Sequence, residues 1–95
     1  RFSPCGKFLY TCVRYDNSIQ VFARKADNSL TKLQHIPCGG DWPRDINISP
    51  DGKLLLSANE RENTVTAFSV GEDGMLTRLP GELSVPAPNN IVFLD

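Results

Sequence analysis

The amino-acid sequence repeats itself, with corresponding residues 46 positions apart, as Ser3 and Ser49 are. The clearest match is SPCGKFLY at residues 3–10, which returns as SPDGKLLL at residues 49–56. Two further matches follow without a gap, residues 17–22 with 63–68 and residues 30–33 with 76–79. Near the end the spacing falls to 45, so that Pro43 aligns with Pro88. A repeat of about 40–50 residues made of short strands is typical of a β-propeller, in which each repeat forms one blade.

Within each repeat, four short strands are expected to alternate with turns. In the second repeat, the alternation of apolar and polar residues and the β-branched residues predict strands over residues 46–48, 53–58, 64–70 and 75–85. The sequence Pro50-Asp51-Gly52 provides turn chemistry between the first two strands. The Pro80-Gly81 pair interrupts the last segment, which favours an edge strand. No window has the periodicity of a helix, so we expect almost no helical structure.

The repeat predicts an all-β fold with about two four-stranded antiparallel blades of a β-propeller. We divide the chain into a first blade repeat, residues 1–45, a second blade repeat, residues 46–85, and a closing inner strand, residues 86–95. Propellers close with about four to eight blades, and two blades leave open strand edges. We therefore expect the chain to be the C-terminal part of one longer propeller domain. The remaining blades would be its partners, and the chain alone would have little stability.

Composition and charge disfavour several classes of function. Ten basic and eleven acidic residues are mixed along the 95 residues without a basic patch, which argues against nucleic acid or a membrane surface as a partner. No stretch approaches the length of a membrane-spanning helix, about 20 apolar residues. The three cysteines have unrelated spacings and His35 is the sole histidine, so we expect no metal site. Unpaired cysteines indicate a reducing compartment, and hence the cytoplasm.

The alternation of connections in an antiparallel blade sorts the loops onto two ends. The loops after the second strands (residues 13–17 and 59–63) and the connections between blades (37–44 and 85–89) share one end, which we call the mouth. Arg14 and Arg44 are expected there, nearest the central channel. Guanidinium groups are the preferred bidentate partners of carboxylates and phosphates, so this pair suits an anionic substrate. Most loop arginines are simply exposed to solvent and bind no ligand, and this alternative remains for both Arg14 and Arg44.

Other residues of chemical interest have simpler interpretations. Glu60 at the mouth fits an ion pair with an arginine, the orientation of that arginine, or a general base. Trp42 fits a packing residue at the blade junction better than a ligand platform. His35 falls on an outer strand and is assigned no chemistry. No serine has a histidine and an aspartate at the spacing of a known triad, so a serine nucleophile is not supported.

Two stretches resemble the lactonase family of seven-bladed propellers. The first is Phe2-Ser3-Pro4-x-Gly6-Lys7, and the second, more specific, is Asp41-Trp42-Pro43-Arg44 followed one strand later by Ala58-Asn59. The family includes bacterial 6-phosphogluconolactonases and fungal carboxy-muconate cyclases. The resemblance implies a seven-bladed parent that hydrolyses, or reversibly forms, a lactone ring on an anionic sugar or dicarboxylate. It also implies that the reaction needs neither a metal nor a cofactor.

The same resemblance assigns roles to four residues. The family's mouth arginines match Arg14 and Arg44, which become catalytic candidates that hold the phosphate or carboxylate and stabilise the oxyanion. The family's Ala-Asn-Gln loop matches Ala58-Asn59-Glu60, which makes Asn59 and Glu60 substrate-binding candidates, with an acid in place of the glutamine. The acid/base residues of the family fall outside these 95 residues. A second hypothesis is a non-catalytic propeller that presents its mouth to a ligand or a protein partner.

Overall fold

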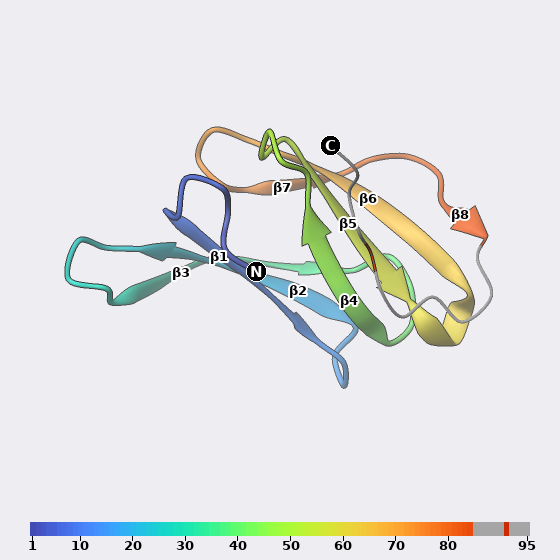
Figure 1. Ribbon diagram of the computed structural model, residues 1–95. Coiled ribbons are helices and arrows are strands. Elements are labelled where there is room, and N and C mark those ends of the chain that lie inside the picture. Colours follow the sequence, from blue (N-terminus) through green and yellow to red (C-terminus); the bar gives the residue numbers. More distant parts are fainter. Residues whose placement is uncertain (85–90, 92–95) are drawn as a thin grey trace.

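The computed structural model describes residues 1–84 and residue 91, which form two twisted antiparallel sheets packed against each other (Figure 1). The first sheet consists of β1 (Phe8–Val13), β2 (Ser18–Arg24) and β3 (Leu30–Pro37), in that order. The second sheet consists of β4 (Pro43–Ile48), β5 (Leu54–Asn59), β6 (Thr64–Val70), β7 (Leu76–Arg78) and β8 (Leu83–Ser84). Both β7 and β8 pair with β6. The all-β antiparallel fold expected from the repeat is confirmed.

The fourth strand of the second repeat is interrupted at Pro80-Gly81, as predicted, and this break separates β7 from β8; Gly81 has a φ of 86°. The strands depart from the prediction in two other places. β4 begins at Pro43, so the second sheet starts inside the segment assigned to the first blade repeat. In the first sheet, the place of a fourth strand is held by Phe2, whose backbone bridges to Leu9. The expected inner strand, residues 86–95, lies outside the described residues except for Ile91.

Helical structure within residues 1–84 is limited to one 3₁₀ turn, Glu60–Glu62, which lies in the loop expected at residues 59–63. Asn63 ends this turn in the left-handed conformation. Over the same residues, no helix has the length and apolar character needed to cross a membrane.

The turns explain why the repeat is visible in the sequence. Three left-handed backbone positions recur 46 residues apart, with φ angles of 75° and 74° at Gly6 and Gly52, 51° and 56° at Asn17 and Asn63, and 69° and 81° at Asn28 and Gly74. A Cβ atom is disfavoured in this conformation, and glycine and asparagine tolerate it best. The two repeats therefore keep these residue types at matching turns.

The core lies between the two sheets. It is formed by apolar side chains that alternate along the strands: Tyr10, Ile19 and Val21 from the first sheet, and Ile46, Ile48, Leu55, Phe68 and Leu76 from the second. Two polar contacts also join the sheets. The Tyr10 hydroxyl donates to the carbonyl oxygen of Gly74 at 2.8 Å, and the Gln34 amide bonds to both the N–H and the carbonyl of Leu76, at 2.7 and 2.9 Å.

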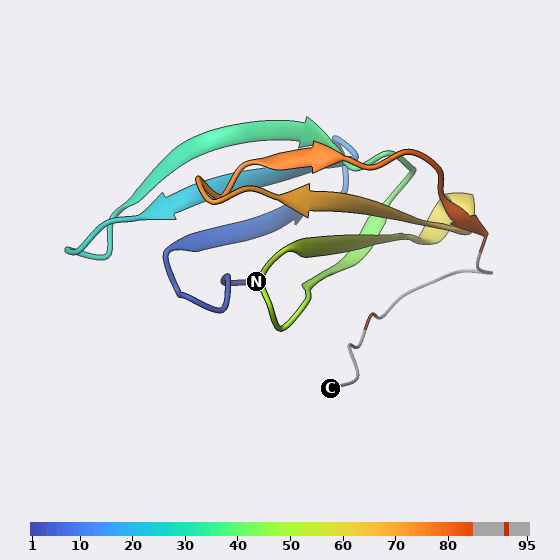
Figure 2. The same cartoon turned by 90° about the horizontal axis from the view of Figure 1, so that it is seen from above.

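Figure 2 shows how the two sheets are aligned, with β3 beside β7 at one edge, and with β4 and the N-terminus toward the other edge. The contact between Gln34 on β3 and Leu76 on β7 confirms that these two strands are neighbours. The strands of the two sheets thus follow the same order, with β1 and β4 at one edge and β3 and β7 toward the other, as in neighbouring propeller blades.

Candidate functional site

The described loops of the predicted mouth meet at one end of the two sheets, the lower end in Figure 1. The loop between β1 and β2 reaches the blade junction through Asn17, whose side-chain oxygen accepts the N–H of Trp42 at 2.8 Å. The 3₁₀ turn reaches the same junction, because the N–H groups of Glu60 and Arg61 donate to the carbonyls of Trp42 and Asp41, at 3.1 and 3.2 Å. Backbone and side-chain bonds therefore hold three mouth segments in one rigid arrangement.

Arg44 occupies a special position at the start of β4. Pro43 is paired with Asn59 and Asp45 with Ala58, so Arg44 is the additional residue of a β-bulge. A bulge breaks the in-and-out alternation of a strand and re-aims a side chain, and bulges are frequent beside active sites. The Arg44 guanidinium lies at the mouth with its Nη1 3.6 Å from Oε2 of Glu60, and 47% of its side chain is exposed.

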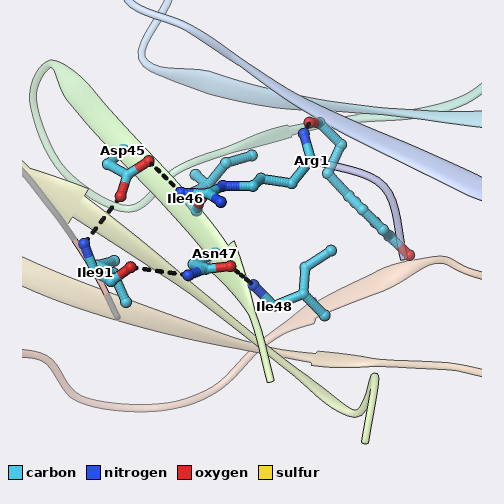
Figure 3. Close-up of polar contacts among 7 residues, drawn as sticks. Arg1, Asp45, Ile46, Asn47, Ile48 and Ile91 are labelled. Carbon is cyan, nitrogen blue, oxygen red and sulfur yellow. Dashed lines mark hydrogen bonds and ion pairs between the residues drawn. The ribbon is translucent and has the colours of Figure 1, made fainter. Parts of the chain in front are cut away.

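The strand that carries Arg44 is anchored on both sides by polar contacts (Figure 3). The Asp45 carboxylate accepts the N–H of Ile91 at 2.9 Å through Oδ2, and its Oδ1 lies 3.5 Å from the Arg1 guanidinium. Arg1 also donates through Nε to the carbonyl of Ile46 at 3.1 Å. Asp45, the residue after the bulge, thus contacts Arg1 on one side and Ile91 on the other.

Trp42 packs between side chains from both repeats. The Arg61 guanidinium carbon lies 3.8 Å from the centroid of the Trp42 ring, and Tyr15 meets that ring edge-on at 5.8 Å between centroids and an interplanar angle of 85°. Trp42 has a φ of 62°, a left-handed conformation that is strained for a bulky residue. These contacts match the packing role expected at the blade junction, and the stack on Arg61 is a contact that the sequence did not indicate.

Asn59 lies in the interior of the second sheet and is fully buried. Its side-chain oxygen accepts the Ser57 hydroxyl at 2.9 Å, and its Nδ2 donates to the hydroxyls of Thr64 and Thr66, at 3.3 and 3.1 Å. A Cβ placed on Gly40 would lie 2.6 Å from the Asn59 side chain, so the junction packs directly onto this amide. The Asn59 amide therefore holds β5, β6 and the junction together, and its contact with a substrate stays a prediction.

Arg14 directly follows β1 and is exposed, and its carbonyl accepts the N–H of Asn17 at 3.4 Å across the turn. Figure 1 shows the end of β1 and the start of β4 at the same end of the two sheets, so Arg14 and Arg44 belong to one mouth. Arg14, Arg44 and Glu60 thus share the end expected of them, and their roles toward a substrate stay predictions.

A polar cluster around Asp16 was not expected from the sequence. Nε2 of His35 lies 2.5 Å from Oδ2 of Asp16, and the Ser18 hydroxyl donates to the same oxygen at 3.0 Å. The hydrogen bonds from Ser18 and His35 lower the pKa of the Asp16 carboxyl. Both partners bind the carboxylate and neither activates the other, so the cluster lacks the order of a nucleophilic triad. Antiparallel pairing of β2 with β3, which sets His35 opposite Gln20, brings the three residues together.

Metal-binding groups and cavities are the two remaining features of the described residues. Among the described residues, no group of three or more His, Cys, Asp or Glu side chains is arranged to hold a metal ion. A cavity of about 620 Å³ lies between the sheets at the end opposite the mouth, where Pro4, Phe8, Gly52 and Val70 contribute to its lining. Its lining contains no arginine, although it includes the ionisable side chains of Cys5, Asp51 and Lys53.

Comparisons with known proteins place the chain among related propellers. Residues 1–93 match the family described as "Lactonase, 7-bladed beta-propeller". A 6-phosphogluconolactonase from Formosa agariphila is 39% identical over 93 residues, and one from Bacillus subtilis is 34% identical over 91 residues. Each of these alignments covers 94% of this chain and 26% of the relative. The solved structure of the periplasmic gluconolactonase of Pseudomonas aeruginosa has a TM-score of 0.94 at 26% identity, and the match covers 100% of this chain and 27% of that one. The chain therefore spans about a quarter of the length of these relatives.

Proposed function

Because the chain belongs to the lactonase family of seven-bladed β-propellers, we propose that it supplies part of the mouth of a lactone hydrolase that acts on an anionic sugar lactone. The names of the relatives support this class of reaction, since two are 6-phosphogluconolactonases and one solved structure is a gluconolactonase. The observation that carries the proposal is the position of Arg44, a β-bulge residue whose guanidinium group lies beside Glu60 at the mouth.

The proposed mechanism gives the two arginines electrostatic roles. Arg14 and Arg44 hold the phosphate or carboxylate of the substrate, because a guanidinium group offers paired N–H donors to such an anion. When water attacks the lactone carbonyl, negative charge develops on its oxygen, and a fixed guanidinium stabilises that oxyanion. The loss of one such donor typically raises the barrier by about 2.7–4 kcal/mol. Arginines in this role require no metal and no cofactor, so the activity should persist in the presence of a chelator.

The direct test is lactone hydrolysis by the full-length propeller that carries these residues. Arg44→Ala should lower kcat/KM by about 100- to 1,000-fold, because it removes an oxyanion donor. Arg24→Ala is a matched control, since Arg24 is also exposed but lies at the end of β2 that is remote from the mouth. Unchanged hydrolysis in Arg44→Ala would remove this arginine from the proposed site. A stable wild-type propeller that binds a lactone without opening it would favour the non-catalytic hypothesis instead.

We also propose a cytoplasmic location for the protein. Cys5, Cys12 and Cys38 are all free thiols, and free thiols persist best in a reducing compartment. Fractionation of cells that produce the full-length protein, with immunodetection in each fraction, tests this location.

A further inference from the structure

We infer that Glu60 is a specificity-determining residue that weakens the preference of the mouth for a phosphate group. The inference rests on the proposed function and concerns the same site. Its starting point is the ion pair between Glu60 and Arg44, in which Oε2 lies 3.6 Å from Nη1. The guanidinium group proposed to hold the substrate anion already has a carboxylate of the same chain beside it.

The 3₁₀ turn that carries Glu60 is held in position by main-chain hydrogen bonds. Glu60 begins the 3₁₀ turn, and its N–H donates to the carbonyl of Trp42 at 3.1 Å. The next residue, Arg61, donates from its N–H to Asp41 and stacks its guanidinium on the Trp42 ring at 3.8 Å. The turn is thus fastened to the junction that leads into β4. Glu60 also keeps only 29% of its side chain exposed, against 47% for Arg44, so the carboxylate is the more shielded partner.

The charges around the pair do not attract a dianion. The mouth segments 13–17, 37–44 and 59–63 carry three arginines against four carboxylates: Arg14, Arg44 and Arg61 against Asp16, Asp41, Glu60 and Glu62. Arg61 is stacked on Trp42, which leaves Arg14 and Arg44 as the proposed anion-binding groups. Because negative charges outnumber positive ones, the field of these segments does not concentrate anions at the mouth.

The free energy of binding at Arg44 should therefore differ between a charged and an uncharged lactone. A phosphate must compete with the Glu60 carboxylate for the guanidinium group, and it approaches a like charge as it does so. An uncharged lactone leaves the ion pair in place, because its hydroxyls can accept from Arg44 and donate to Glu60. Glu60 consequently penalises the phosphorylated substrate more than the unphosphorylated one.

The test compares two substrates in the full-length propeller, 6-phosphoglucono-δ-lactone and glucono-δ-lactone. Glu60→Gln keeps the size and polarity of the side chain and removes its charge. It should raise the ratio of kcat/KM for the phosphorylated over the unphosphorylated lactone by about two- to fivefold, the range that corresponds to a partly exposed ion pair. Glu60→Ala, which also removes the carboxylate, should shift the ratio in the same direction.

Glu62→Gln is the matched control, because Glu62 lies in the same 3₁₀ turn, is exposed and carries the same charge. Screening by solvent and salt should keep its effect on the ratio below about 1.5-fold. An equal effect of Glu60→Gln and Glu62→Gln, or a fall of the ratio in Glu60→Gln, would overturn the inference. Loss of both activities by the same factor would also overturn it, because this result indicates that Glu60 only positions Arg44.

A second measurement separates this inference from the proposed function. Titration of the same proteins with inorganic phosphate, followed by calorimetry, measures anion binding without any hydrolysis. Glu60→Gln should bind phosphate about two- to fivefold more tightly than the wild-type protein, and Glu62→Gln should not. If neither lactone is hydrolysed but this difference appears, the proposed function fails and the role of Glu60 in anion selection stands. If lactones are hydrolysed but the variants bind phosphate equally, the proposed function stands and the role of Glu60 in anion selection fails.

Discussion

The side-chain amide of Asn47 donates a hydrogen bond to the carbonyl oxygen of Ile91 at 2.8 Å (Figure 3). Arg1 makes the equivalent contact one repeat earlier, since its Nε donates to the carbonyl oxygen of Ile46 at 3.1 Å. In the sequence repeat, Arg1 corresponds to Asn47 and Ile46 corresponds to Ile91. One position of each repeat therefore reaches the main chain of the following repeat, although an arginine fills it in one copy and an asparagine in the other.

Replacement of Asn47 by aspartate tests this contact. The variant keeps an acceptor for the N–H of Ile48, which Asn47 binds at 2.9 Å, but loses the donor to Ile91 and adds a charge near Asp45. We expect the free energy of unfolding of the full-length protein to fall by about 1–3 kcal/mol, as measured by urea denaturation. Gln20→Glu is the control, because it makes the same change from amide to carboxylate on β2 of the other sheet. Equal losses in the two variants would show that the bond to Ile91 contributes nothing.

The left-handed backbone of Trp42 predicts an unusual order of stability among its variants. Trp42→Gly and Trp42→Ala both lose the contacts with Arg61 and Tyr15, but only glycine relieves the strain of a φ of 62°. The glycine variant should therefore be the more stable of the two, by about 1 kcal/mol in denaturant titrations. At Leu30, an exposed strand residue without a positive φ, the order should be the opposite, with alanine more stable than glycine. The same order at both positions would contradict this account.

The buried hydroxyl of Tyr10 should make the protein less stable at high pH. Burial raises the pKa of the Tyr10 hydroxyl to about 12, from 10 in the unfolded chain. The folded state therefore keeps its proton over a pH range in which the unfolded state releases it, so the stabilisation is complete below pH 10 and is lost as the pH rises toward 12. Tyr10→Phe lacks this titration and also the hydrogen bond to Gly74.

At neutral pH, Tyr10→Phe should be less stable than the wild-type protein by about 1 kcal/mol, since the bond to Gly74 is missing. Unfolding in urea at a series of pH values should then show the wild-type advantage shrinking above pH 10. A constant difference up to pH 12 would contradict a shifted titration of this hydroxyl.

Several features of the fold follow from local sequence. The left-handed turns at Gly6, Gly52 and Asn17 need residues that tolerate a positive φ, and these residues made the repeat recognisable. Antiparallel connectivity alternates the ends at which loops emerge, which is why the loops at Arg14 and Arg44 could be assigned to one mouth. The Pro80-Gly81 pair also indicated the interruption that separates β7 from β8, because proline cannot donate to the ladder.

The details of the candidate site depend on the register of the strands and on contacts between segments distant in sequence. The bulge at Arg44 arises from the pairing of β4 with β5, and nothing in the order of residues marks which one is additional. The interior position of Asn59 depends on Thr66 and Gly40, which reach it only in the folded sheet.

The sequence by itself thus determined the repeat, the strand-rich blades and the end of the molecule at which the arginines lie, because turn conformation and strand alternation are local properties. Only the tertiary structure decided that Glu60 is the partner of Arg44, that Arg61 stacks on Trp42 and that Asn59 faces inward. These contacts form when loops from the two repeats pack against each other. Their energies depend on distances between residues far apart in sequence, and these distances are set only in the folded state.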